Sequence, residues 1–590
     1  MKKIKSKWSV SLFVMIFSMQ VSGQMLSYTR LTAGFETPEF EGGRSDFHFS
    51  DINHDGHVDI LSIGDHGNPG TDQSGLLIWF NQGDESFVNF MSGYFGYGGI
   101  VAGDLNNDGF MDIGMGMHHN YATTGIGDQL IEAALGDGTG QNWTPWDVGL
   151  ATNGETWAMF GTDFGDVNND GYLDLVSISM GSGGGMHVYL NQTDGSWVPS
   201  FGFVGNNSDN LVQFCDINND GFIDIVAAHA AGTAWFGDGN GDFVNDDTGL
   251  PSAGSQSPRN GISTGDVNND GGCGFAFITQ EGGIKVFEWN EAESAWVDYS
   301  GNLPSAGTAR LSQLFDMNAD GFTDVLAFGD QVIQLWLGTG ADSWVEDAVF
   351  QTAAASGGAE AFRVGGDLDH NGHGDIVLLA EEGPWYNYQN IMYVFVEDDV
   401  PENLWIRPLY PKGNEKLYPG SVRNISWASA VPNNSASLVK IEISAFGPDG
   451  PWWHLADSLM NNGRFQWTVP DYGSVDCYLR LTVNDGVDEA SYVTDMPFTI
   501  IGEPTSAPSE QKISNADVFP NPGNSTIFLN ASKKILLFEM INLSGLTTLS
   551  VEHPGHSINT EQLQTGVYFY RFFLEDGGRI TGKWIKKPTE

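Results

Sequence analysis

A nine-residue acidic pattern recurs seven times along this chain, and it constrains the fold more than any other feature. It reads DINHDGHVD from Asp51, DLNNDGFMD from Asp104, DVNNDGYLD from Asp166 and DINNDGFID from Asp216. It continues as DVNNDGGCG from Asp266, DMNADGFTD from Asp316 and DLDHNGHGD from Asp367. A spacing of about fifty residues predicts an array of similar supersecondary units, each packed against its neighbours.

The composition of the pattern indicates a calcium loop. Oxygen-bearing side chains at positions 1, 3 and 5 converge when the loop turns sharply, glycine at position 6 permits the turn, and position 7 can offer its backbone carbonyl. A strand follows the loop, and an aspartate at position 9 replaces the glutamate that closes an EF-hand. The alternative is an Asx-rich turn that binds no metal, and the repeated ligand pattern argues against it. The predicted ligands are Asp51, Asn53, Asp55, His57, Asp59, Asp104, Asn106, Asp108, Phe110, Asp112, Asp166, Asn168, Asp170, Tyr172, Asp174, Asp216, Asn218, Asp220, Phe222, Asp224, Asp266, Asn268, Asp270, Asp316, Asn318, Asp320, Phe322, Asp324, Asp367, Asp369, Asn371, His373 and Asp375.

Two of the seven copies depart from the pattern. The fifth has Gly274 where the others have the ninth-position aspartate, so we expect its site to be weak or empty. The seventh has Asp369 and Asn371 at positions 3 and 5, which keeps the oxygens but changes their charges. The sequence therefore predicts up to seven bound Ca²⁺ ions.

The rest of each unit has the pattern of antiparallel strands. An apolar strand, a Gly/Asp turn and then an aromatic residue follow each of the first six loops, which is typical of a hairpin. We expect these aromatics to pack between sheets rather than to bind ligand; they are Phe87, Trp143, Trp197, Phe243, Trp296 and Trp344. The seventh unit lacks such a hairpin, and the segment from Ser27 to Glu36 resembles an outer strand. The sequence thus predicts an all-β, seven-bladed β-propeller over residues 24–400, closed by its N-terminal strand.

A family resemblance supports this fold. The segment FGYGGIVAGDLNNDGFMDI, from Phe95 to Ile113, resembles the FG-GAP repeat of integrin α-subunits, and the whole run is similar to bacterial VCBS-type repeat proteins. The resemblance implies a seven-bladed propeller with calcium between the first two strands of a blade. It does not identify a ligand, because such propellers occur in adhesins, lectin-like proteins and some polysaccharide lyases.

The segments outside the repeats predict export. Residues 1–23 have the lysine-rich start, apolar run and small residues of a signal peptide, and no other stretch is long and apolar enough to span a membrane. Residues 404–501 predict an Ig-like β-sandwich, interpreted as a spacer between the propeller and its anchor, and residues 502–512 a linker. Residues 513–590 resemble the C-terminal sorting domain of the type IX secretion system. The matching positions are Phe519, Pro520, Asn521, Pro522, Gly545, Leu563, Gly566, Tyr568, Gly582 and Lys583.

Charge and cysteine content narrow the possible partners. The chain has 75 acidic and 25 basic side chains, a net charge of −50, which argues against binding to nucleic acid. The resemblance to the sorting domain implies that the chain engages the type IX machinery and reaches the outer cell surface or the medium. The three cysteines are too few for a disulfide framework, and buried free thiols are expected, although Cys215 and Cys273 lie in neighbouring repeats and could pair.

No residue set in the sequence indicates catalysis. It contains no G-x-S-x-G, H-E-x-x-H or Walker motif, so a binding or adhesion protein for a glycan or a surface protein is favoured over an enzyme. A polysaccharide lyase or glycosidase is one alternative, with His66, His118, His119 and His229 as candidates for a shared site. A structural surface component is the other. Trp143, Trp146, Tyr386 and Tyr388 would suit either sugar stacking or protein contact.

Overall fold

The computed structural model describes residues 25–35, 46–64, 75–93, 98–120, 122, 124–180, 184–205, 208–251, 260–352, 362–382, 389–502, 516–519, 525–531, 534–542, 547–555, 557–574 and 579–587. The regular secondary structure of these residues is β-strand, apart from one turn of 3-10 helix, η1 (Pro432–Asn434), so the expected all-β fold is confirmed. Within them no helix has the length and apolarity that a membrane crossing needs. The signal peptide predicted at residues 1–23 lies outside the described residues.

The repeats build seven four-stranded antiparallel sheets within the described part of residues 28–397. The first three sheets contain β2 (Phe47–Ser50), β3 (Asp59–Ile63), β4 (Leu76–Asn81) and β5 (Phe87–Ser92); β6 (Gly98–Gly103), β7 (Asp112–Met117), β8 (Ile131–Gly136) and β9 (Trp143–Pro145); and β10 (Met159–Gly165), β11 (Asp174–Ser179), β12 (Met186–Asn191) and β13 (Trp197–Phe203). The next three contain β14 (Ser208–Cys215), β15 (Asp224–His229), β16 (Gly232–Gly237) and β17 (Phe243–Asn245); β18 (Asn260–Gly265), β19 (Gly274–Ile278), β20 (Ile284–Asn290) and β21 (Ala295–Asp298); and β22 (Leu311–Phe315), β23 (Asp324–Gly329), β24 (Val332–Leu337) and β25 (Val345–Gln351). The last contains β26 (Phe362–Gly366), β27 (Asp375–Glu382), β28 (Gln389–Glu397) and β1 (Tyr28–Leu31).

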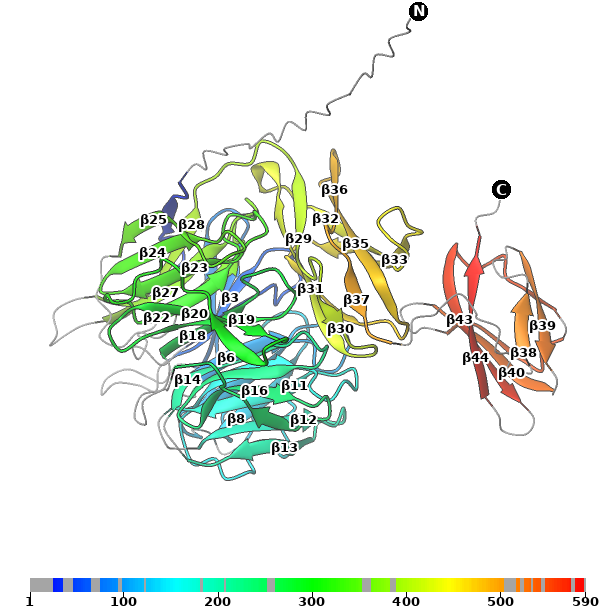
Figure 1. The fold of residues 1–590 in the computed structure, drawn as a ribbon, viewed down its shortest axis with the longest axis horizontal. Coiled ribbons are helices and arrows are strands. Elements are labelled where there is room, and N and C mark those ends of the chain that lie inside the picture. Colours follow the sequence, from blue (N-terminus) through cyan, green and yellow to red (C-terminus); the bar gives the residue numbers. More distant parts are fainter. Residues whose placement is uncertain are drawn as a thin grey trace, which may run out of the picture.

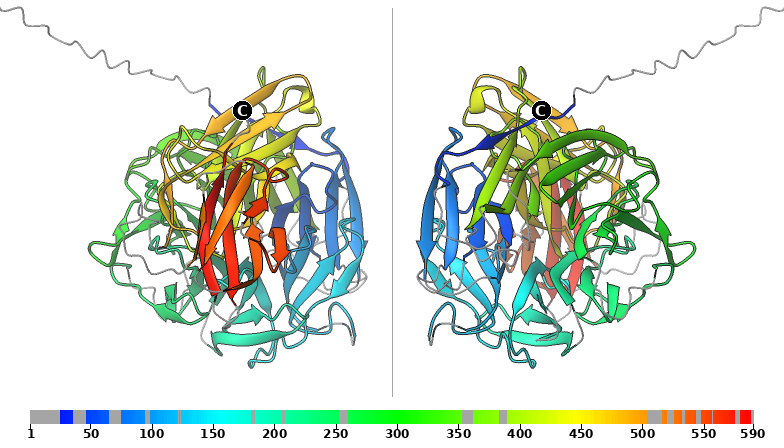
Figure 2. Two further views of the ribbon diagram at one scale, coloured as in Figure 1. Left: turned by 90° about the vertical axis from the view of Figure 1, so that its right-hand side faces the viewer. Right: turned by 90° about the vertical axis from the view of Figure 1, so that its left-hand side faces the viewer.

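The seven sheets are arranged around a ring, which is a β-propeller (Figure 2). The first strands of successive sheets contact one another in the order β2, β6, β10, β14, β18, β22 and β26, and β26 returns to β2. The N-terminal strand closes the ring as expected, because β1 pairs antiparallel with β28, with Tyr28 opposite Glu397. This pairing joins the two ends of the propeller and covers a sheet edge.

Apolar side chains pack the sheets against one another. One cluster joins the first two sheets through Leu61, Ile78, Ile100 and Met115, all fully or almost fully buried. Five of the six predicted packing aromatics are buried as expected, namely Phe87, Trp197, Phe243, Trp296 and Trp344, while Trp143 is half-buried. Tyr386 and Tyr388 lie outside the described residues.

Two further β-structures follow the propeller (Figure 1). The first of these, directly after the propeller, is here called the sandwich and has two sheets. One sheet contains β29 (Trp405–Tyr410), β31 (Val422–Ala430) and β34 (Arg464–Thr468). The other contains β30 (Lys416–Leu417), β37 (Phe498–Ile500), β35 (Ser474–Asn484), β32 (Leu438–Ser444), β33 (Trp453–Met460) and β36 (Glu489–Val493). The other, at the C-terminal end, also has two sheets. One contains β38 (Ala516–Phe519), β39 (Thr526–Ala531) and β42 (Ser557–Asn559), and the other contains β41 (Thr547–Glu552), β40 (Ile535–Ile541), β43 (Gly566–Leu574) and β44 (Arg579–Lys586).

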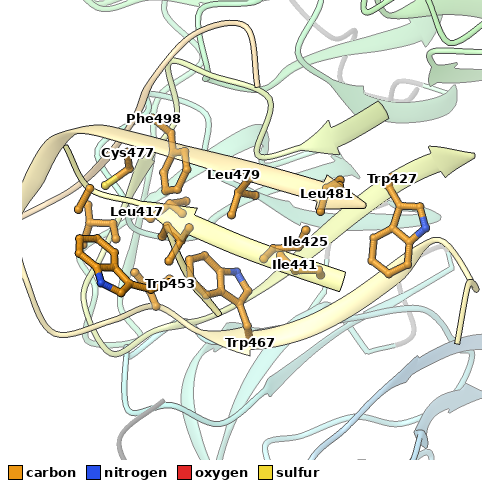
Figure 3. Close-up of a cluster of buried hydrophobic side chains, with 14 of the residues drawn as sticks. Leu417, Ile425, Trp427, Ile441, Trp453, Trp467, Cys477, Leu479, Leu481 and Phe498 are labelled. Atoms are coloured by element: carbon orange, nitrogen blue, oxygen red, sulfur yellow. The ribbon is translucent and has the colours of Figure 1, made fainter. Parts of the chain in front are cut away.

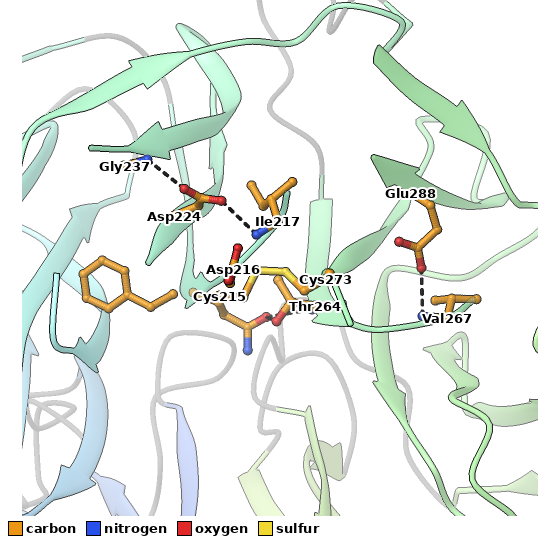
Figure 4. The surroundings of a disulfide bond; sticks show 12 residues. Cys215, Asp216, Ile217, Asp224, Gly237, Thr264, Val267, Cys273 and Glu288 are labelled. Atoms are coloured by element: carbon orange, nitrogen blue, oxygen red, sulfur yellow. Dashed lines mark hydrogen bonds between the residues drawn. A yellow bond between two sulfur atoms is a disulfide. The ribbon is translucent and has the colours of Figure 1, made fainter. Parts of the chain in front are cut away.

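The sandwich has its own apolar core, in which Trp427, Trp453 and Trp467 pack with Ile441 and Phe498 (Figure 3). Cys477 lies in this core as a buried free thiol, as expected. The other two cysteines correct the expectation of free thiols: Cys215 and Cys273 form a disulfide, with Cα atoms 6.2 Å apart (Figure 4). They pair because the ring places the end of β14 beside the fifth acidic segment.

Candidate metal centres

The seven acidic segments, here called the acidic loops, connect the first and second strands of each sheet and share one conformation. In the second loop the amides of Asp108 and Gly109 donate to the two carboxylate oxygens of Asp104, over 3.1 and 2.8 Å. The same pair of hydrogen bonds, from positions 5 and 6 to position 1, occurs in the other six loops. The loops therefore turn sharply around the first aspartate.

Backbone conformation explains the residues at two loop positions. The position-6 glycine has positive φ in all seven loops, for example +93° at Gly109. Position 4, which the sequence analysis did not single out, also has positive φ in all seven, for example 59° at Asn107 and 58° at His54. Asparagine or histidine stands at position 4 in six loops, and their enrichment in the left-handed region is the signal that could have identified it.

The ninth-position aspartates fix the loops to the sheets. Asp112 accepts hydrogen bonds from the amides of Leu105 in the loop (2.8 Å) and Gly136 on β8 (2.9 Å). Burial raises the pKa of Asp112 to about 7 and that of Asp59 to about 8, even though these amide hydrogen bonds lower both. It also raises the pKa of Asp174, Asp224, Asp324 and Asp375 well above the usual range. A buried cation would favour the charged forms of these acids.

The donor set fits a hard divalent cation. Each loop has oxygen-bearing side chains at positions 1, 3 and 5, and in six loops the position-9 carboxylate lies on the first residue of the second strand. In the seventh loop, oxygens of Asp367, Asp369 and Asp375 lie within 4.8 Å of one another. Oxygen-only cages with several carboxylates are the sites that Ca²⁺ prefers.

Hydrogen bonds also connect neighbouring loops around the ring. The side-chain amide of Asn107, at position 4 of the second loop, donates to the carbonyl of Gly171 in the third (2.9 Å). Asn219 makes the same kind of contact with Asp270 (3.0 Å), and Asn269 with Gly321 (3.0 Å). These contacts join the second loop to the third, the fourth to the fifth and the fifth to the sixth.

The sandwich packs on the end of the propeller that carries the acidic loops, here called the loop face, and contacts all seven loops. Two contacts reach position-1 carboxylates: the amide of Val422 donates to Asp166 (2.8 Å), and the side chain of Asn462 donates to Asp51 (3.1 Å). The other five loops accept hydrogen bonds from Gln466, Arg423, Asn414, Arg407 and Val431. The sandwich therefore covers the loop face, and its role as a spacer between the propeller and its anchor stays a prediction.

A cavity of about 590 Å³ lies between the loop face and the sandwich. Its walls include the position-1 aspartates Asp51, Asp166 and Asp216 from the propeller, and Arg423 and Arg464 from the sandwich. Burial lowers the pKa of Arg464, whereas the charge of Asp163 acts in the opposite direction.

The predicted histidine group is only partly assembled. The rings of His118 and His119 lie 4.0 Å apart, and His118 stacks on Phe160 with Trp157 at its edge. His229 is buried instead against Phe203 and Trp235, and its Nδ1 accepts a hydrogen bond from the amide of Ala231. His66 lies outside the described residues.

Comparison with known protein families identifies the repeats of the propeller and the C-terminal domain. Residues 51–115 and 166–227 match the FG-GAP-like repeat, and residues 517–587 match the secretion system C-terminal sorting domain. The chain thus carries FG-GAP-like repeats and a type IX C-terminal sorting domain. The sorting domain indicates export to the cell surface or the extracellular medium, and implies interaction with the secretion machinery.

The solved structures that match this chain have low sequence identity to it. A lectin from Agrocybe aegerita is 16% identical over 54% of this chain and 81% of its own, with a TM-score of 0.37. The BP39L lectin from Burkholderia pseudomallei is 13% identical over 61% and 96%, with a TM-score of 0.40. An ancestral GH74 enzyme is 10% identical over 95% and 78%, with a TM-score of 0.38. No curated protein matches the chain.

Proposed function

We propose that this exported protein is a calcium-loaded binding propeller that recognises an extracellular glycan or surface protein through the end opposite the loop face, here called the far face. The observation that carries the proposal is the coverage of all seven acidic loops by the sandwich. Calcium at these loops would therefore stabilise the ring and its junction with the sandwich, while ligand recognition falls to the far face.

The far face differs from sheet to sheet. The second strand of each sheet runs away from the acidic loop, and six residues of strand span about 20 Å. Residues 118–120, 122 and 124–130, after β7, therefore lie at the far face, as do residues 230–231 after β15. The first connection is long and places His118 and His119 beside Trp157, whereas the second is a tight turn. An aromatic ring beside polar side chains suits stacking on a sugar or contact with a protein.

A catalytic function receives less support from the same region. Glu155, His187 and Tyr189 form a compact acid–histidine–tyrosine group. The phenol of Tyr189 donates to the carboxylate of Glu155, and Nδ1 of His187 lies 3.7 Å from Oε1 of Glu155. The side chains of Glu155 and His187 are fully buried, so a polysaccharide substrate cannot reach them. The asparagine at 153 and the carbonyl of Gly184 occupy the two ring nitrogens of His187. This group therefore positions the far-face loops.

The proposal is tested on a glycan and polysaccharide array with the full mature chain in millimolar calcium. Binding to a defined sugar class that is lost in His119→Ala but retained in Val487→Ala, an exposed change on the sandwich, supports a glycan-binding far face. Absence of glycan binding by the folded protein would favour a protein ligand or a structural surface role. Turnover of a bound glycan that His118→Ala or His119→Ala abolishes would establish the enzyme alternative.

A further inference from the structure

The fifth acidic loop lacks the aspartate that the other six have at position 9. In those six, the ninth-position carboxylate accepts a hydrogen bond from the amide of position 2, over 2.7 to 3.1 Å. In the fifth loop, position 9 is Gly274, which has no side chain to offer. The expectation of a weak or empty fifth site rested on this residue.

A glutamate from the neighbouring strand supplies the missing carboxylate. Glu288 on β20 accepts a hydrogen bond from the amide of Val267, position 2 of the fifth loop, over 2.8 Å. Figure 4 shows this contact beside the equivalent one of the fourth loop, in which Asp224 accepts from Ile217 over the same 2.8 Å. Glu288 is only 2% exposed, so its carboxylate faces the loop rather than solvent.

The strand register explains how Glu288 reaches this place. Phe275 pairs with Phe287, so Glu288 stands opposite Gly274. A Cβ atom at Gly274 would lie 2.5 Å from Cδ and 2.6 Å from Oε1 of Glu288, and 2.5 Å from the carbonyl oxygen of Phe287. An aspartate there would therefore require the glutamate to be replaced and the paired strand to shift slightly. The residues at the position of Glu288 in the other six sheets are all apolar, namely Phe80, Leu135, Leu190, Phe236, Leu337 and Val396.

Acidic side chains lie near Glu288, and a bound cation would compensate their charge. Asp266 and Asp270, at positions 1 and 5, are close enough to act on it electrostatically. Among the described residues, no lysine, arginine or histidine forms an ion pair with Glu288. A buried carboxylate is costly unless a positive charge compensates it. The disulfide fixes position 8, Cys273, to the residue that precedes the fourth loop, which holds the fifth loop in place.

We propose that Glu288 is the ninth-position acid of the fifth loop, and that this loop is a complete cation site formed by an exchange of acid and small residue between paired strands. The inference rests on the proposed binding of calcium by the acidic loops. It makes Glu288 a metal ligand that the nine-residue pattern does not contain.

The test counts the Ca²⁺ ions bound to the full mature chain by equilibrium dialysis and elemental analysis. We expect Glu288→Gln, which keeps the shape but removes the charge, to bind one ion fewer than the wild type. Asp224→Asn in the fourth loop is the matched control and should lose the same single ion. An unchanged count in Glu288→Gln, with the loss in Asp224→Asn, would overturn the role of Glu288. A wild type that binds no calcium would instead refute the proposed function.

A double variant keeps the inference testable if Glu288→Gln does not fold. Gly274→Asp combined with Glu288→Leu restores the residue pair of the second, third and sixth sheets. It should recover the wild-type count and the wild-type circular dichroism spectrum. A folded double variant with one ion fewer would show that the position-9 acid does not determine binding in this loop, and the proposal would fail.

Discussion

The two ends of the propeller differ in how uniform their connections are and in whether the sandwich covers them. At the loop face, seven connections share one conformation and are covered by the sandwich, and three of them hydrogen bond through position 4 to the next loop. At the far face the connections range from the long one after β7 to a turn at residues 230–231. Uniform geometry suits a repeated ion site, whereas varied loops suit recognition of a particular ligand. The comparison indicates that one sequence repeat can specify a stabilising end and leave the other end free to diversify.

Removal of calcium should have the largest effect, because it acts on all loops at once. With a Kd of ~10⁻⁴ M, ~1 mM calcium stabilises by about 1.4 kcal/mol per site, so seven sites would contribute about 10 kcal/mol. We expect chelation to lower the melting temperature of the full chain sharply, as measured by circular dichroism or calorimetry. Identical melting curves with calcium and with chelator would mean that the loop face is not an ion-stabilised end.

The contact between sandwich and loops gives the next largest effect. Gln466 accepts from the amide of Asp104 and donates to its carbonyl, over 3.1 and 2.7 Å. Loss of two hydrogen bonds in Gln466→Ala should cost roughly 1–3 kcal/mol. It should also weaken calcium binding, because the bonded residue is position 1 of a loop. Isothermal titration with calcium checks this, with Val487→Ala as control. Equal calcium affinities of the two variants would show that the sandwich contact does not influence the ion sites.

A single loop can be strained without touching its neighbours. Gly109 has a φ of +93°, and a Cβ atom placed there would have no atom within 4 Å. Gly109→Ala therefore isolates backbone strain, which we expect to cost roughly 1–2 kcal/mol and to reduce calcium affinity in one loop. Gly555→Ala, with equally open space and no positive φ, is the matched control. If the two variants have the same free energy of unfolding and the same calcium affinity, the loop does not depend on the positive φ that glycine permits.

The sequence predicted those parts of the molecule that repeat and missed those that depend on distant pairing. The nine-residue pattern predicted the loops, and the odd composition of the last unit predicted that β1 would complete it. Glu288 could not be found this way, because it faces Gly274 only once β19 and β20 pair. The contact of Val422 with Asp166 joins residues that are 256 positions apart, and no local signal specifies it. The positive φ of position 4 could have been predicted, because asparagine and histidine are enriched in the left-handed region.

The smallest effect on stability, and the most specific effect on binding, should come from the far face. His119 is exposed, so His119→Ala should change the free energy of unfolding by no more than about 0.5 kcal/mol. If the far face holds the ligand site, the same change should weaken binding by tenfold, or about 1.4 kcal/mol, in a titration with the ligand. Calcium affinity should not change, because the second strand separates His119 from the nearest acidic loop. A variant that loses calcium affinity together with ligand binding would show that the two ends are coupled, and the division of roles between them would have to be abandoned.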